Sequence, residues 1–299
     1  IARTPEIPAL GKNTQEKRRN PASIELAQME ASWLGAQLHG LKGDEFSAYG
    51  VSKEDGGVAL TEVPRDSEAD RAGLKRNDLV QGLNGKKIAS VDQLLKTYAE
   101  AGDAPLEVVV VRDQQKETVK IKDAPFVVAE SVSGADGFTR VPLPASPSGT
   151  ITSNHQGNDD PLGLLVDGKL ARGHRPVFAD KIVNGAYRMD LGGARAVSAI
   201  TSWSFDQDGV RGAQRITLFG SKVDEDPGWN LADRSQFVPL GTIDTTQLKN
   251  GTFNGVSLRA RKGQSLGTFR WIVWRAFPVT ARAENTAFQE LHVELLAEE

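Results

Sequence analysis

The most informative run in the sequence is Ser67-Glu68-Ala69-Asp70-Arg71-Ala72-Gly73-Leu74-Lys75-Arg76-Asn77-Asp78-Leu79-Val80. Asp66 or Ser67 predicts the start of a short helix, because either side chain can accept a hydrogen bond from a free amide of the first turn. The helix is expected to end at Gly73. The run then changes to apolar residues, which predict a strand over residues 79–83.

Further signals lie on either side of this run. Upstream, the pattern becomes strand-like from Trp33, and the alternating stretch 57–63 ends at a proline, which is a turn signal. Downstream, Asn84-Gly85 predicts a two-residue hairpin turn, because both residues tolerate positive φ. Ser90 predicts the cap of a helix whose apolar residues recur at helical spacing: Val91, Leu94, Leu95 and Tyr98.

The order of these segments resembles a PDZ domain of the bacterial HtrA protease type. That family has a hydrophobic-Leu-Gly loop, here Trp33-Leu34-Gly35-Ala36, then an Ala-Gly-Leu-x-x-x-Asp segment, here 72–78. Asn84-Gly85-Lys86 and a groove helix follow. The resemblance covers about residues 30 to 122. It implies a β-rich α+β fold, a partly open barrel, that captures the C-terminus of a protein or peptide.

In this resemblance the partner's C-terminal strand adds to the sheet edge that begins at Ala36. A nest of backbone N–H groups faces its carboxylate, and the last side chain of the partner enters an apolar pocket. The residues implied for peptide binding are Leu34, Gly35, Ala36, Leu38, Val91, Leu94 and Leu95. The alternative, which the sequence leaves open, is that the apolar members of this set are only core.

From Gly149 onward the sequence has an all-β character. Short apolar-alternating stretches are separated by Gly, Asn and Asp, which predicts about eight strands in a sandwich or jelly roll. Five segments of this half resemble the discoidin, or coagulation-factor C-type, β-sandwich, a relative of the galactose-binding carbohydrate modules. They are Val166-Asp167-Gly168, Tyr187-Arg188-Met189-Asp190-Leu191-Gly192, Ala199-Ile200-Thr201-Ser202-Trp203-Ser204, Gln214-Arg215-Ile216-Thr217-Leu218-Phe219-Gly220-Ser221 and Phe288-Gln289-Glu290-Leu291-His292-Val293.

The second resemblance also implies a structural calcium site. Asp167 and Glu290 would provide carboxylates, and backbone carbonyls would complete a shell of six to eight oxygens. The carbonyls implied are those of Leu164, Lys169 and Gln289. The chain departs from the family at Arg172, where a threonine is usual. The alternative is that Asp167 forms an Asx turn with Gly168 and that Glu290 pairs with an arginine.

A sugar site in this fold would need an aromatic platform and hydrogen-bond donors on loops. Trp229 lies in the Pro-Gly turn of residues 226–230, and four other polar residues lie in predicted loops. The predicted carbohydrate-binding residues are therefore Trp229, His155, His174, Arg211 and Asn285. By contrast, the three tryptophans in predicted strands are expected to be core: Trp203, Trp271 and Trp274.

The domain boundaries follow from changes in composition. Residues 1–22 are predicted as a flexible arm or linker and 23–123 as the PDZ domain. The proline-bearing stretch 124–148 is predicted as the connection, and 149–299 as the discoidin-like sandwich. The alternative, which the sequence leaves open, is that the first strand of the second domain lies within this connection. The predicted fold class is therefore mainly β with two domains.

Composition excludes several kinds of function. The net charge of −3 argues against nucleic acid as a partner, and the absence of cysteine excludes disulfides and thiol nucleophiles. No apolar run reaches the roughly 18 residues that a membrane span needs. The four histidines are dispersed, and neither a catalytic motif nor the protease domain that normally precedes an HtrA-type PDZ domain is found in this chain.

The sequence therefore predicts a non-catalytic, secreted or periplasmic bacterial protein, or the C-terminal binding region of a larger enzyme. Its first domain would capture protein C-termini, and its sandwich would bind a carbohydrate or another surface. Two alternatives remain open. One is an interaction scaffold with a purely structural sandwich, and the other is a hydrolase with a site between the domains.

Overall fold

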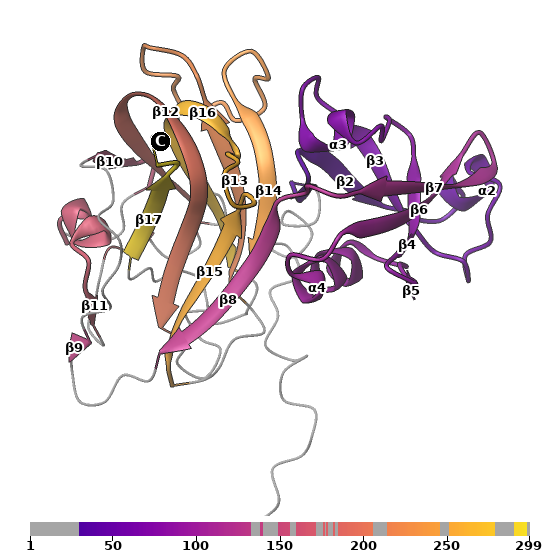
Figure 1. The fold of residues 1–299 in the computed structure, drawn as a ribbon, viewed down its shortest axis with the longest axis horizontal. Helices are drawn as coiled ribbons and strands as arrows, with labels where there is room; N and C mark the ends of the chain where they lie inside the picture. Colours follow the sequence, from indigo (N-terminus) through magenta and orange to yellow (C-terminus); the bar gives the residue numbers. More distant parts are fainter. Residues whose placement is uncertain are drawn as a thin grey trace, which may run out of the picture.

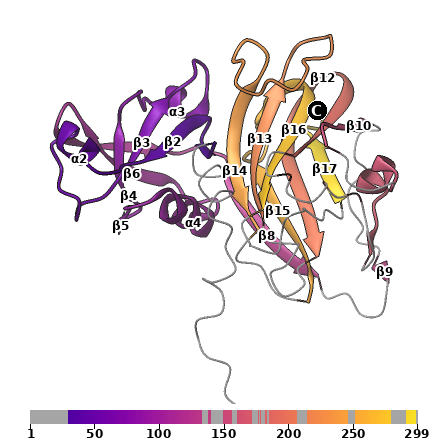
Figure 2. The ribbon, with the colours of Figure 1, turned by 180° about the vertical axis from the view of Figure 1, so that it is seen from behind.

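The computed structural model of this 299-residue chain describes residues 30–132, 138–139, 149–155, 160–171, 176, 178, 182, 185–205, 214–245, 251–278 and 290–297. Two β-rich domains lie side by side, and the views from opposite sides show each with its own sheet (Figures 1 and 2). The predicted fold class, mainly β with two domains, is confirmed. In the described residues, no helix is long and apolar enough to cross a membrane.

The first domain is built on a seven-stranded sheet. Its strands lie in the order β1 (Ser32–Trp33), β2 (Ala36–Gly40), β3 (Val58–Glu62), β4 (Leu79–Leu83), β6 (Leu106–Arg112) and β7 (Gln115–Ile121), and β5 (Lys86–Lys87) pairs with β4. The helices are α2 (Glu45–Ala48), α3 (Glu68–Arg71) and α4 (Val91–Ala101).

Local chemistry accounts for the ends of these elements. The Ser67 hydroxyl accepts a hydrogen bond from the Asp70 amide, and the Ser90 hydroxyl accepts one from the Gln93 amide, so both predicted helix caps are confirmed. Asn84-Gly85 turns between β4 and β5 with φ values of 48° and 75°, as the predicted hairpin turn requires.

The second domain contains β8 (Phe126–Val132), β10 (Thr150–Ser153), β12 (Ala186–Phe205), β13 (Gln214–Ser221), β14 (Val238–Asp244), β15 (Phe253–Arg259), β16 (Gly267–Pro278) and β17 (Glu290–Leu295). The principal order is β14-β13-β16-β12-β15-β8, with β10 and β17 also pairing with β12. The described part of the chain also holds a short 3-10 helix, η2 (Leu162–Val166), and a separate two-stranded pair, β9 (Phe138–Thr139) with β11 (Leu170–Ala171).

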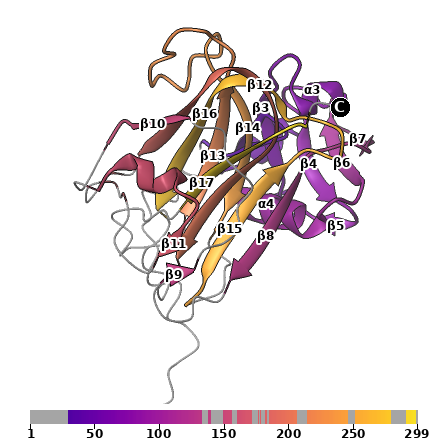
Figure 3. The same cartoon turned by 60° about the vertical axis from the view of Figure 1, so that its left-hand side comes forward.

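The long strand β12 joins the two layers of the sandwich. Its first part, 186–190, pairs with β10 on one side and with β16 on the other, while 199–205 pairs with β15, and 197–203 with β17. The register with β16 shifts between Asp190 and Arg195, which marks the point where the strand passes from one layer to the next. Figure 3 shows the second layer, with β17, β15 and β8 in view.

Strand β8 lies inside the stretch 124–148 that was predicted as the connection. It pairs with β15 from Phe126 to Val132 and so forms an edge of the sandwich. Phe126-Val127-Val128 has the aromatic and β-branched composition of a strand. The strand is the one that the sequence left open as the first strand of the next domain within the connection.

The cores of the two domains are continuous. One cluster of buried apolar side chains includes Trp33 and Tyr98 of the first domain and Ile216 and Leu258 of the second. Figure 1 shows α4 at the boundary between the domains, and α4 contacts both β8 and β14 there. The two domains are therefore packed against each other as one body.

Candidate functional site

A pocket of about 380 Å³ lies between the two domains. Its lining draws on both sides of the boundary and mixes aromatic, amide and charged side chains. The lining residues are Glu30, Ser32, Gln37, Asn154, Ala186, Phe219, Trp229, Asn230, Leu231, Ala232, Arg234, Pro239 and Arg275.

The sandwich supplies one side of the pocket through adjacent strands. Arg275 of β16 lies directly opposite Ala186 of β12, and Phe219 of β13 lies opposite Pro239 of β14. Phe219 is buried, and Trp229 and Leu231 of the loop between β13 and β14 pack against its cluster. The apolar part of the lining is therefore continuous with the core of the sandwich.

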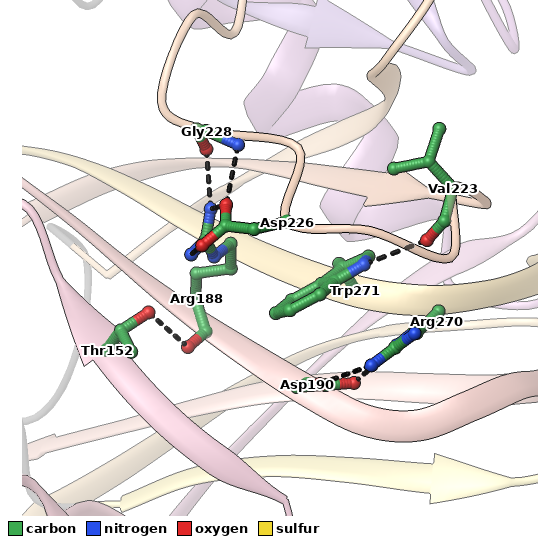
Figure 4. A network of polar contacts seen from close by, with 8 residues as sticks. All are labelled: Thr152, Arg188, Asp190, Val223, Asp226, Gly228, Arg270 and Trp271. Carbon is green, nitrogen blue, oxygen red and sulfur yellow. Dashed lines mark hydrogen bonds and ion pairs between the residues drawn. The ribbon is translucent and has the colours of Figure 1, made fainter.

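The loop that carries Trp229 is held to the sheet by Arg188 (Figure 4). The Arg188 guanidinium donates to both carboxylate oxygens of Asp226 at 2.7 Å and to the Gly228 carbonyl at 2.6 Å. It also lies 4.5 Å from the centre of the Trp229 ring. Hydrogen bonding to Arg188 lowers the pKa of the Asp226 carboxyl below its ordinary value. The half-buried indole of Trp229 is therefore fixed in place by a buried cation.

The first domain supplies the other side through charged and amide groups that pair across the boundary. The Glu30 carboxylate lies 3.2 Å from Nε of Arg275. Arg234 of the sandwich pairs with Glu62 of β3 at 3.0 Å and donates to the Gln37 side-chain carbonyl at 3.3 Å. Each of these ion pairs joins the two domains at the pocket.

The seven predicted peptide-binding residues come together in the first domain. Leu34, Ala36, Leu38, Val91, Leu94 and Leu95 are all buried, and Gly35 forms a two-residue turn with Leu34. The turn joins β1 to β2, and Trp33 pairs with Ala36. The outer edge of β2 thus carries a strand of the same chain. The assignment of these residues to peptide binding stays a prediction.

The structure also brings together two members of the predicted calcium site. The Lys169 amide donates to the Asp167 carboxylate at 3.0 Å, which is the Asx-type alternative, and the Gly168 amide donates to the buried Glu290 carboxylate at 3.1 Å. Leu164 lies in η2, and Gln289 lies outside the described residues. Within the described ranges, no group of three or more His, Cys, Asp or Glu is placed to hold a metal ion. Calcium binding stays a prediction.

Of the predicted carbohydrate-binding residues, Trp229 lines the pocket. His155 follows β10, its amide donates to the Ser153 hydroxyl, and its neighbour Asn154 lines the pocket. His174, Arg211 and Asn285 lie outside the described residues. Trp203, Trp271 and Trp274 are buried, as predicted for core residues.

Sequence reasoning missed the seven polar residues that line the pocket: Glu30, Ser32, Gln37, Asn154, Asn230, Arg234 and Arg275. Glu30 and Arg275 are 245 positions apart in the sequence. No local pattern encodes a contact of that kind, so only the packing of the two domains reveals it.

No protein-family model matches the chain. The first domain is similar to a probable periplasmic serine protease do/HhoA-like of Haemophilus influenzae, with 30% identity over 100 residues, 33% of this chain and 21% of that protein. It is also similar to a probable periplasmic serine endoprotease DegP-like of a Marinomonas species, with 26% identity over 110 residues, 35% of this chain and 23% of that protein. The chain spans about a fifth of the length of these relatives.

Among solved structures, the chain is similar to CBM32-1 from a family 31 glycoside hydrolase of Clostridium perfringens. The identity is 12% and the TM-score 0.37, over 51% of this chain and 99% of that one. It is also similar to the HtrA3 PDZ domain bound to a phage-derived ligand, with 21% identity and a TM-score of 0.26, over 30% of this chain and 81% of that one. The predicted resemblance is confirmed: the chain is similar to HtrA-type proteins in its first domain and to a discoidin-like β-sandwich module in its second.

Proposed function

We propose that this chain is a non-catalytic binding protein, or the binding region of a larger enzyme, and that the pocket between its domains binds a carbohydrate. The observation that carries the proposal is Trp229, a half-buried indole fixed by Arg188 in the wall of a pocket with amide and guanidinium groups. A secreted or periplasmic location is part of the proposal, and the names of the periplasmic relatives support it.

The pocket has the chemistry that a sugar requires. An indole face covers the apolar C–H face of a sugar ring, while side-chain amides donate to and accept from its hydroxyls. Gln37, Asn154 and Asn230 bring amides to the lining. The volume of about 380 Å³ falls within the range of small-ligand sites. A neutral or weakly charged sugar suits this lining, because the charged side chains of the lining are already in ion pairs: Glu30 with Arg275, and Arg234 with Glu62.

The same lining argues for binding without turnover. Glycoside hydrolysis uses two carboxyl groups on either side of the scissile bond. Glu30 is the one carboxylate among the described lining residues, and it is paired with Arg275. The nearby Glu62 is paired with Arg234. The hydrolase alternative therefore lacks the acid and base that it needs in this pocket.

A glycan array followed by calorimetric titration of each hit tests the proposal. We expect a dissociation constant near the millimolar range, about −4 kcal/mol, and a loss of at least tenfold in Trp229→Ala. Lys222→Ala is the matched control, because Lys222 is exposed on the same loop and does not line the pocket. The absence of any hit, or equal affinity in both variants, would favour the alternative of a purely structural sandwich.

A second candidate function is the capture of protein C-termini by the first domain. One observation favours it: the outer edge of β2 accepts an antiparallel strand beside α4, as its pairing with β1 demonstrates. Titration with peptides whose C-termini are free or amidated tests this function, since carboxylate capture requires stronger binding of the free acid.

A further inference from the structure

Residues 30–33 occupy the edge of β2 to which a partner strand would add. Ser32 and Trp33 pair with Gln37 and Ala36 in antiparallel register, on the side of β2 opposite β3. The Leu38 amide donates to the Ala31 carbonyl at 3.0 Å, so the pairing extends beyond the hairpin itself. Backbone groups that an incoming peptide would use are therefore satisfied within the chain.

The side chain of Trp33 packs against α4, the helix that contacts β2. Trp33 lies directly opposite Ala36, so both side chains project from the same face of the sheet. The indole is fully buried and meets the Tyr98 ring of α4 edge-on, with centroids 6.0 Å apart. At the other end of β2, a Cβ built on Gly40 would lie 3.8 Å from Val91, so α4 follows β2 along its length.

The sandwich holds the same segment from its outer side. The Ser32 amide donates to the Thr242 hydroxyl of β14 at 2.8 Å, and the Thr217 hydroxyl of β13 donates to the Glu30 carbonyl at 3.1 Å. Both amide and carbonyl point away from β2 toward β13 and β14. Residues 30–33 thus lie between the two domains and form hydrogen bonds with both.

A buried cation holds α4 to the sandwich beside this segment. Arg215 of β13 is 5% exposed and lies 2.9 Å from Asp92 of α4 and 2.9 Å from Asp244 of β14. Helix α4 therefore cannot move away from the sandwich without breaking the ion pair between Asp92 and the buried Arg215.

We infer that residues 30–33 are the resident ligand of the groove between β2 and α4. Trp33 takes the position of a partner's last side chain, and the groove clamps this segment against the sandwich. A free C-terminal peptide binds only after the segment is displaced. This inference rests on the second proposed function, the capture of protein C-termini by this groove. It adds that the groove has an internal occupant, and that peptides with an apolar last residue compete with this occupant.

Competition sets the size of the expected effect. A segment tethered next to its site has an effective concentration in the millimolar range. The apparent affinity for a free peptide equals its intrinsic affinity multiplied by the fraction of molecules in which the groove is open. Weakening the segment's contacts by about 1.4 kcal/mol therefore raises peptide affinity about tenfold.

The test uses a fluorescent synthetic peptide with the sequence of residues 28–33 and a free C-terminal carboxylate, titrated against the full chain. Trp33→Ala removes the anchor of the segment. Thr242→Val removes the acceptor for the Ser32 amide without changing the first domain, so it keeps the test open if Trp33→Ala does not fold. Thr201→Val is the matched control, because its buried hydroxyl bonds to Ser257, away from the segment.

We expect binding at least tenfold tighter in Trp33→Ala and about tenfold tighter in Thr242→Val than in the wild type and Thr201→Val. Equal binding in all four proteins would overturn the internal ligand while leaving peptide capture intact. No binding by any folded variant would overturn both.

Discussion

The indole of Trp33 meets the phenol ring of Tyr98 edge-on, with an angle of 81° between the ring planes. Trp33 directly precedes the hairpin turn at Leu34 and Gly35, whereas Tyr98 lies near the end of α4. The Tyr98 hydroxyl donates to the Pro125 carbonyl, which directly precedes β8. The contact thus links the segment 30–33, the groove helix and the first strand of the sandwich.

The turn at Gly35 should be intolerant of any side chain. Gly35 has φ +82°, and an added Cβ would lie 2.9 Å from the Ser67 Cβ and 3.1 Å from the Pro239 carbonyl of the sandwich. Gly73 has φ +81° but nothing within 4 Å of such a Cβ. We expect Gly73→Ala to cost about 1 kcal/mol from backbone strain and Gly35→Ala to cost roughly 2 kcal/mol more. Denaturant unfolding measures both, and equal costs would mean that Ser67 and Pro239 leave room for an added methyl group.

The ion pair between Asp92 and Arg215 should contribute to the docking of α4. Asp92→Ala leaves Arg215 paired with Asp244 alone, and we expect a loss of about 1 kcal/mol, because Asp92 is partly exposed. Glu100→Ala, on the same helix but paired only with surface lysines, should change stability by less than about 0.5 kcal/mol. Thermal melts of the two variants make the comparison. If the two losses are the same, the pair does not hold the domains together.

The sandwich should become less stable in mild acid because of His292. Its side chain is buried on β17, and burial lowers the pKa of the imidazole below its ordinary value of 6.5. As the pH falls below 6.5, this imidazole takes up a proton in the unfolded chain before it does so in the folded chain. The free energy of unfolding therefore decreases by up to about 1.4 kcal/mol for each pH unit. Urea unfolding at pH 7.5, 6.5 and 5.5 should show this fall in the wild type and a smaller one in His292→Gln. Identical pH profiles would exclude His292 as the source.

Calcium, if the loop of Asp167 binds it beside Glu290, should stabilise the sandwich modestly. A site of the extracellular kind has a dissociation constant of roughly 10⁻⁴ to 10⁻³ M, which gives about 1–2 kcal/mol at a few millimolar calcium. Melts with calcium and with chelator should therefore differ in the wild type and coincide in Asp167→Ala. A wild type that is indifferent to calcium would mean that Asp167 serves only its turn with Lys169.

The sequence predicted the elements whose signals are local. Ser67 and Ser90 cap helices through amides three residues away, and Asn84-Gly85 forms its turn from its own backbone preferences. The turn at Leu34 was harder, because an apolar residue at φ 53° is uncommon and gives no pattern to read. The loop that the resemblance implies for carboxylate binding forms a tight hairpin turn at Leu34 and Gly35, and its role in binding stays a prediction.

The candidate site depended on contacts that the sequence does not encode locally. Trp229 was predicted from its Pro-Gly turn, whereas Glu30 and Arg275 meet only because the domains dock. The same holds for Arg234 and Glu62, which are 172 positions apart. The motifs that resemble known families indicate the two folds, but the way that two folded surfaces match is a property of their packing.

Amide hydrogen exchange at Leu38 and Ser32 tests most directly that the groove is filled by the chain itself. The Leu38 amide donates to Ala31, and the Ser32 amide donates to Thr242. If residues 30–33 are held in the groove, both amides should exchange slowly, at rates near those of the buried strands. Exchange at Leu38 as fast as at Gly43, in an exposed turn, would mean that the edge of β2 is open and would contradict the account.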